Sequence, residues 1–137
     1  MDPEEFKART KQFGLRIVRL VESLPNRMVP ATLGKQLLRA GTSVGANYRS
    51  ACRAKSPADF ISKMETVEEE CDESLYWMEQ LIDAGYLKAS RVSGLMQEGS
   101  EILAMVVASA RTARRGNATS RKTRVQSAIR NSQSAIP

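Results

Sequence analysis

The feature that most constrains the fold is a set of four long segments in which apolar residues recur every three or four positions, the spacing of one helix face. The third segment has the clearest start, because Ser56 is a favoured N-cap, Pro57 suits the first helical position and Asp59 completes a variant of the capping box. Its apolar stripe ends at Ile82, and Gly85 follows where a C-terminal cap is expected. The sequence therefore predicts one long amphipathic helix here.

The other three segments follow the same pattern. The first has Asp2 as its N-cap and ends at Pro25, the second spans about residues 31–55, and the fourth spans about residues 90–114. Short connections between long helices favour antiparallel neighbours. The predicted fold is all-α, an up-down-up-down antiparallel four-helix bundle in residues 1–115, followed by a flexible basic C-terminal tail in residues 116–137.

Three glycines, Gly34, Gly41 and Gly45, fall on the apolar side of the second segment. Each is expected to cost a helix about 1 kcal/mol relative to alanine. A glycine on a buried helix face allows a neighbouring backbone to approach closely. A phosphate-binding glycine loop is the alternative, but such a loop follows a strand and no strand is predicted. We therefore expect tight helix packing.

The chain contains no histidine, which excludes Ser–His and Cys–His nucleophile pairs, HExxH zinc sites and Glu-x-x-His di-iron sites. Catalysis by carboxylates alone requires an acid with a raised pKa near a second acid, and the solvated run Glu68-Glu69-Glu70 does not suggest one. Cys52 and Cys71 lie in apolar helical patterns and are expected to be reduced. We expect no enzyme, no cofactor, no metal site and no small-molecule substrate.

The N-terminus is acidic and lacks the apolar stretch of a signal peptide. No apolar run approaches the roughly 20 residues that a membrane-spanning helix needs. The predicted location is the cytoplasm, without membrane contact.

Basic charge is concentrated at the C-terminus. Residues 111–137 hold seven basic residues and no acidic residue, in a chain whose net charge is +6. From residue 116 on, the composition is polar and predicts disorder, with a helical continuation of the fourth segment as the alternative. Such a tail can neutralise phosphates without a shaped site, and a purely solubilising tail is the competing interpretation. The candidate nucleic-acid contacts in this part of the chain are Arg114, Arg115, Arg121, Lys122 and Arg124.

The second and third segments carry charge stripes of opposite sign. At about 100° per residue, four basic residues of the second segment align on one line, namely Lys35, Arg39, Arg49 and Arg53. The third segment presents an acidic flank, with Glu65, Asp72 and Glu79 as candidate interface acids. Three interpretations of the basic stripe remain open. It is a solvated face, it pairs with these acids within one chain or across a subunit interface, or it contacts nucleic-acid phosphates. The stripe lacks the aromatic residues that stack on unpaired bases.

Three blocks of the sequence carry a family resemblance, namely Gln36–Tyr48, Ser56–Phe60 and Glu69–Trp77. Their order and spacing resemble the 23S ribosomal RNA intervening-sequence proteins, over about residues 6–110. The resemblance implies a small bacterial cytosolic four-helix bundle that assembles into a ring-like homopentamer. The positions that match the family pattern are Arg39, Ser43, Asn47, Asp72, Glu73 and Trp77. Family members commonly place a glutamate shortly after the asparagine, where this chain has Tyr48-Arg49-Ser50-Ala51. A tail like residues 116–137 is not part of the family pattern.

Two functional classes follow. The first is a non-catalytic homo-oligomer that associates with RNA or DNA through basic residues. The second is a protein-interaction scaffold, also oligomeric, without nucleic-acid affinity.

Overall fold

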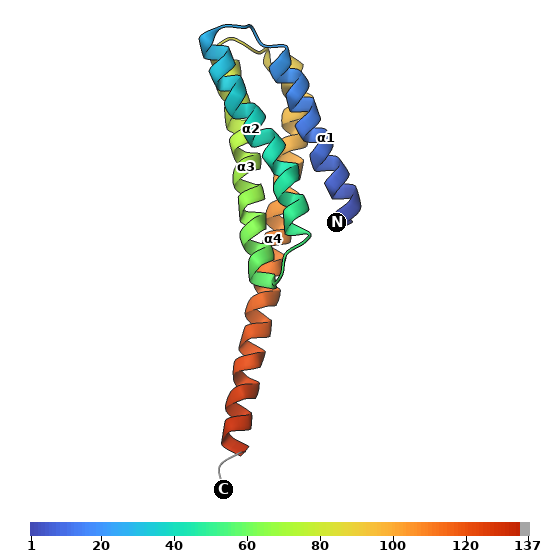
Figure 1. The fold of residues 1–137 in the computed structure, drawn as a ribbon, viewed down its shortest axis with the longest axis vertical. Coiled ribbons are helices and arrows are strands. Elements are labelled where there is room, and N and C mark those ends of the chain that lie inside the picture. The colour runs from blue at the N-terminus through green and yellow to red at the C-terminus, as the bar shows by residue number, and fades with distance from the viewer. Residues whose placement is uncertain (135–137) are drawn as a thin grey trace.

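Four helices in an antiparallel arrangement make up the described part of the protein, residues 1–134 of a computed structural model (Figure 1). They are α1 (Pro3–Glu22), α2 (Met28–Ala51), α3 (Pro57–Asp83) and α4 (Ala89–Ser134). Each helix packs on its neighbour in chain order, and α1 meets α4 to close the bundle. Helix accounts for 87% of residues 1–134, and this part of the chain contains no strand. The predicted all-α four-helix bundle is confirmed.

The predicted helix caps are present in the structure. The Asp2 carboxylate accepts a hydrogen bond from the Glu4 backbone N–H at 3.2 Å, and the Ser56 hydroxyl accepts one from the Asp59 N–H at 3.1 Å. Gly85 adopts a φ of +86°, a left-handed conformation that favours glycine. The N–H groups of Gly85 and Tyr86 then bond back into the last turn of α3, which is the pattern of a Schellman cap.

The boundaries of α2 differ from the prediction. The sequence predicts a helix over about residues 31–55, whereas α2 spans Met28–Ala51. Pro30 lies in the first turn, where the missing N–H has no helical partner, so the proline does not delay the start. At the other end, the residues after Ala51 are needed to reverse the chain before Ser56 caps α3.

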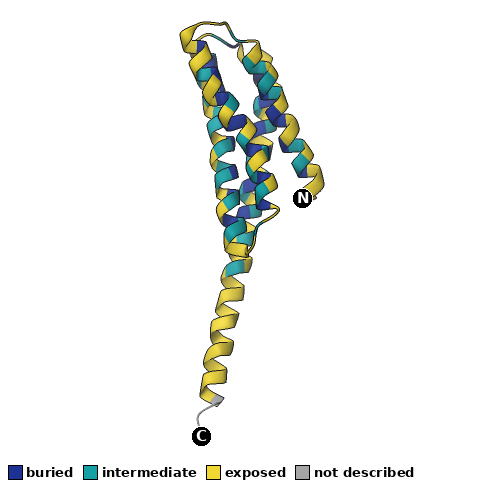
Figure 2. Cartoon of the chain, in the orientation of Figure 1, coloured by how far each residue is buried: buried dark blue, intermediate teal, exposed yellow. Residues whose placement is uncertain are grey.

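The core is the set of apolar stripes that the spacing predicts. Phe13, Ile17, Leu37, Met64 and Ile102 are all fully buried, and together they draw on every helix. Fully burying each such side chain stabilises the fold by about 1.5–3 kcal/mol. The hydrophobic effect therefore holds the four helices together along most of the bundle length (Figure 2).

The two cysteines have different environments. Cys71 is buried in the core as expected, where burial raises the pKa of its thiol to about 12 and the thiol donates to the Gly99 carbonyl at 3.3 Å. Cys52 was expected on the apolar side of the second helix, but it caps the C-terminal end of α2 and is exposed. Both thiols are free.

The glycines of α2 allow α1 to approach closely, as predicted. A Cβ atom built on Gly41 would overlap the Ile17 side chain, and one on Gly45 would lie 3.3 Å from the backbone of Thr10 and Lys11. Both contacts are tighter than ordinary van der Waals distances. The glycines therefore serve helix packing.

The last helix is longer than the sequence predicts. The sequence favours a disordered tail from residue 116, with helical continuation as the alternative, and the structure has α4 continuing to Ser134. Extending an existing helix needs no new nucleation, so the polar composition does not end it. This extension projects from the end of the bundle where α3 begins (Figure 1), and residues 118–133 are all exposed (Figure 2). The predicted residues 135–137 of the tail lie outside the described part of the chain.

Candidate functional site

The C-terminal extension of α4, residues 112–134, is the most distinctive surface of the molecule, and we call it the α4 arm. Its 23 residues extend over about 35 Å at 1.5 Å per residue. Two large apolar side chains on it are exposed, Val125 at 58% and Ile129 at 54%. The arm therefore contributes little to the core, and its side chains are available for other contacts.

Most of the basic residues of the α4 arm have no acidic partner. Arg114, near its base, is bound to Glu65 of α3 at 3.0 Å. The others that the sequence singles out form no ion pair within residues 1–134, namely Arg115, Arg121, Lys122 and Arg124. Because the arm holds no acid at all, it carries a continuous positive potential.

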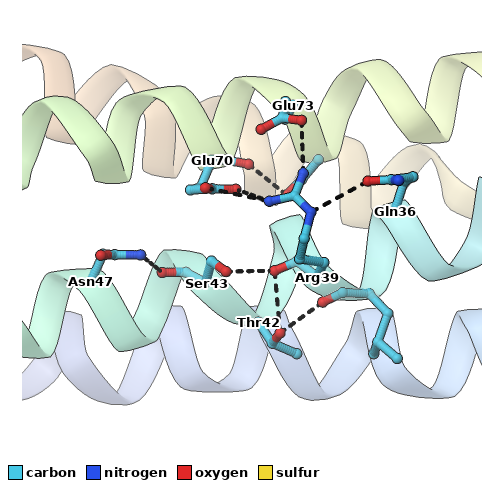
Figure 3. A network of polar contacts seen from close by, with 9 residues as sticks. Gln36, Arg39, Thr42, Ser43, Asn47, Glu70 and Glu73 are labelled. Atoms are coloured by element: carbon cyan, nitrogen blue, oxygen red, sulfur yellow. Dashed lines mark hydrogen bonds and ion pairs between the residues drawn. The ribbon is translucent and has the colours of Figure 1, made fainter.

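Arg39 is engaged within its own chain (Figure 3). Its guanidinium lies 3.2 Å from a Glu70 carboxylate oxygen and 2.8 Å from one of Glu73, and its Nε donates to Gln36 at 3.3 Å. The sequence predicts Glu65, Asp72 and Glu79 as interface acids, and within one chain it is two other acids of α3 that face Arg39. The contact joins the outer sides of α2 and α3.

Two further positions of the family pattern continue this network along α2. The Ser43 hydroxyl donates to the Arg39 carbonyl at 2.6 Å, and the Asn47 amide donates to the Ser43 carbonyl at 2.8 Å (Figure 3). These side chains satisfy backbone carbonyls of their own helix. Their contacts are structural ones in the isolated chain.

A groove of about 550 Å³ runs along the outer side of α1 and α2, and we call it the α1/α2 groove. Gly14 and Gly45 hollow its floor, and Leu15, which is 41% exposed, lines one wall. Lys11 and Arg49 also line it, and neither forms an ion pair within residues 1–134. The groove is thus partly apolar and carries unpaired positive charge.

A second groove, of about 540 Å³, lies between α3 and α4, and we call it the α3/α4 groove. Its floor contains Leu103 and Val107, both partly buried. Four acids line it, namely Glu65, Glu68, Glu69 and Asp72. Of these, Glu65 has Arg114 as a partner, while the others form no ion pair with described residues. The two grooves therefore lie on different pairs of helices and carry opposite charge.

The remaining predicted site residues lie outside both grooves. Lys35 and Arg53 are exposed on α2 and just beyond its end, without an ion pair in the described chain. Glu79 is exposed further along α3. The predicted basic stripe is therefore divided, with Arg39 paired to α3 and Arg49 in the α1/α2 groove.

Sequence reasoning missed the ion pair that joins α1 to α4. Arg9 donates to Glu98 twice, from Nη2 at 2.7 Å and from Nε at 2.9 Å, and Glu101 lies 3.8 Å away. Hydrogen bonding to Arg9 lowers the pKa of Glu98, and the same bond raises the pKa of Arg9. A signal was present, because Glu98 and Glu101 are the only acids after Asp83 in the sequence.

Residues 1–134 contain no cluster of three or more His, Cys, Asp or Glu side chains arranged to hold a metal ion. None of the helices in this described part is long and apolar enough to cross a membrane. The notable chemistry of the surface is therefore its distribution of charge.

The 23S rRNA-intervening sequence protein family matches residues 5–108, which is most of the chain. The chain belongs to this family. A solved structure from the S23 ribosomal protein family, a protein with unknown function from Bacteroides thetaiotaomicron, is 34% identical to it. The superposition has a TM-score of 0.74 and covers 81% of this chain and 99% of that one. No curated protein matched the chain.

The extent of the family match separates the molecule into two parts. Residues 5–108 carry both grooves and the Arg39 network, so these belong to the family fold. The α4 arm begins after the match ends. The arm is therefore a feature of this chain outside the matched family region.

Proposed function

We propose that this protein is a non-catalytic homo-oligomer that associates with RNA or DNA through the α4 arm. The observation that carries the proposal is an exposed, acid-free helical arm with four basic residues that have no acidic partner within residues 1–134. Lysine and arginine side chains on such a helix release counterions when they neutralise phosphates. Because this affinity is independent of sequence, no shaped pocket is required. A nucleic-acid partner of this kind fits a cytoplasmic location.

Self-association is the second part of the proposal. The α1/α2 groove carries unpaired Lys11 and Arg49, and the α3/α4 groove carries unpaired Glu68, Glu69 and Asp72. The grooves are similar in volume, and each has an apolar floor. Because the two grooves are different surfaces of the molecule, a contact between them in different copies would be heterologous, and such contacts close into rings when the rotation allows. A ring-like homopentamer is the assembly that the family resemblance implies.

A charge exchange tests the self-association. Arg49→Glu places a negative charge in the α1/α2 groove and should raise the dissociation constant of the assembly at least about tenfold, since like charges across an interface cost several kcal/mol. Asp72→Lys on the same chain should restore assembly, because each interface regains an opposite pair. Lys35→Glu is the matched control, as this residue lies outside both grooves. A monomer at micromolar concentration for the wild-type protein in light scattering would contradict this part of the proposal.

Nucleic-acid association is tested by removing charge from the arm and keeping its length. The variant with Arg115, Arg121, Lys122 and Arg124 all replaced by Gln should keep the oligomeric state and lose most affinity for nucleic acid. If the wild-type protein binds no duplex or single-stranded nucleic acid at about 50 mM salt, where electrostatic binding is strong, the association is refuted. The scaffold interpretation, which the complementary grooves support independently, would then replace it.

A further inference from the structure

We infer that the α4 arm binds duplex DNA, in preference to RNA and to single strands, by lying in the major groove as a helix. This inference rests on the proposed association with nucleic acid and adds which nucleic acid, and which of its surfaces, the arm fits. It starts from the finding that the basic segment is a helix and not a disordered tail.

The shape of the arm fits B-form DNA. An α-helix with its side chains is about 10–12 Å across, and the B-DNA major groove is about 12 Å wide and admits a helix. The major groove of A-form RNA is deep and narrow, so side chains do not reach the base edges in it. Residues 118–133 of the arm are all exposed and the arm projects beyond the bundle, so it can enter a groove without collision from the other helices (Figures 1 and 2).

The pattern of side chains on the arm explains its exposed apolar residues. At about 100° per residue, Ala118, Val125 and Ile129 fall within about 40° of one another on one line of the helix. Such small and apolar side chains suit contact with base edges, notably the thymine methyl group. The two large ones are more than half exposed, and no described part of the chain covers them.

Basic residues lie on both sides of this apolar line. On the same projection, Arg121 lies about 40° from Val125 on one side, and Lys122 lies about 20° from Ile129 on the other. A helix seated in the major groove has a phosphate backbone on each side, so basic groups on both flanks reach both strands. The exposed Thr119, Ser120 and Thr123 add further hydrogen-bonding groups.

Single strands and membranes fit the arm less well. The last aromatic residue in the sequence is Tyr86, so the arm has no side chain on which an unpaired base could stack. A membrane-surface helix typically presents Trp, Phe and Leu on its apolar side, and the arm has none of these within residues 112–134.

The experiment compares nucleic acids of one sequence on the full-length protein. Fluorescence anisotropy measures binding to a DNA duplex of about 20 bp, to the RNA duplex of the same sequence, and to single-stranded DNA and RNA. The affinity for the DNA duplex should be at least about tenfold higher than for the others. DNA in which glucosylated hydroxymethylcytosine fills the major groove should bind as weakly as the RNA duplex. Equal affinity for all of these would overturn the inference while leaving the proposed function intact. No binding to any of them would refute both.

A proline substitution separates a seated helix from a flexible polycation. Ser120→Pro leaves every charge in place and interrupts the arm between Arg115 and Arg121, so affinity for the DNA duplex should fall at least about tenfold, because proline breaks or kinks a helix interior. Ser120→Ala is the matched control and should bind like the wild type. An unchanged melting temperature and an unchanged oligomeric state would show that the bundle is intact. Wild-type affinity in the proline variant would overturn the inference, and binding to anionic vesicles without DNA binding would assign the arm to membranes.

Discussion

The ion pair between Arg9 and Glu98 joins α1 to α4, the neighbouring pair of helices whose backbones approach each other least closely. The Glu98 side chain is 22% exposed and that of Arg9 is 32% exposed, so the pair is partly shielded from water. We predict that Glu98→Gln, which keeps the size of the side chain and removes its charge, lowers the free energy of unfolding by about 1–2 kcal/mol at pH 7.

This magnitude lies between two limits. Exposed ion pairs contribute about 0.2–1 kcal/mol, and hydrogen bonds to charged groups contribute about 1.5–3 kcal/mol. The two short bonds from Arg9 move the expected value toward the upper range, and the remaining exposure lowers it. Glu4→Gln is the matched control, because Glu4 is 80% exposed and its partner Lys7 lies three residues away on the same helix. That change should cost about 0.5 kcal/mol or less.

The direction of the pKa shift of Glu98 determines how the stability difference between the two proteins changes with pH. The pKa of Glu98 is lower in the folded protein than its ordinary value of 4.5, so the unfolded chain binds the proton more readily. The contribution of the pair is therefore fully present above about pH 4.5 and is lost as the pH falls through the lower folded pKa. Urea denaturation of wild type and Glu98→Gln at one protein concentration, from pH 7 down to pH 3, should show a difference that shrinks with acidity. Equal stabilities at pH 7, or a difference that grows toward pH 3, would refute the reasoning.

Two further predictions concern local packing and capping. Gly41→Ala should destabilise the protein by about 1–3 kcal/mol, because the added Cβ atom would overlap the Ile17 side chain. Gly116→Ala lies at a site with open space and should stabilise the helix by up to about 1 kcal/mol. Thermal melts in which Gly41→Ala is the more stable variant would contradict the packing. Ser56→Ala should cost about 1 kcal/mol by removing the N-cap of α3, measured by chemical denaturation, and an unchanged midpoint would show that Asp59 alone caps the helix.

The bundle can be predicted from the sequence because the helix-capping residues and the spacing of apolar residues indicate the same helices. Ser56 and Gly85 mark the two ends of α3, and the stripe between them is buried as the period of 3.6 requires. The predicted start of α2 is too late because a proline at residue 30 suggests a linker, although proline is tolerated in the first helical turn.

Only part of the candidate site can be predicted from the sequence. The opposite charge of α2 and α3 indicates that the two helices pair, but which acid faces Arg39 depends on the rotation of each helix in the bundle, and spacing alone does not fix it. The pairing of Arg9 with Glu98 joins the first and last helices, so it depends on their axial offset. The length of α4 is underestimated because residues 116–134 are polar, with Gly116, Asn117 and several Ser and Thr residues and few apolar side chains, a composition typical of disorder.

The central claim, that the α4 arm binds nucleic acid through its basic residues, is tested most directly by the salt dependence of binding. The affinity of the wild-type protein for a DNA duplex should be measured over a range of salt concentrations beside the variant with Arg115, Arg121, Lys122 and Arg124 replaced by Gln. Each phosphate contact contributes about −0.9 to the slope of log affinity against log salt, so the loss of four contacts should make the slope shallower by about 3.6. The same steep slope for both proteins would contradict the account and place the phosphate contacts elsewhere on the molecule.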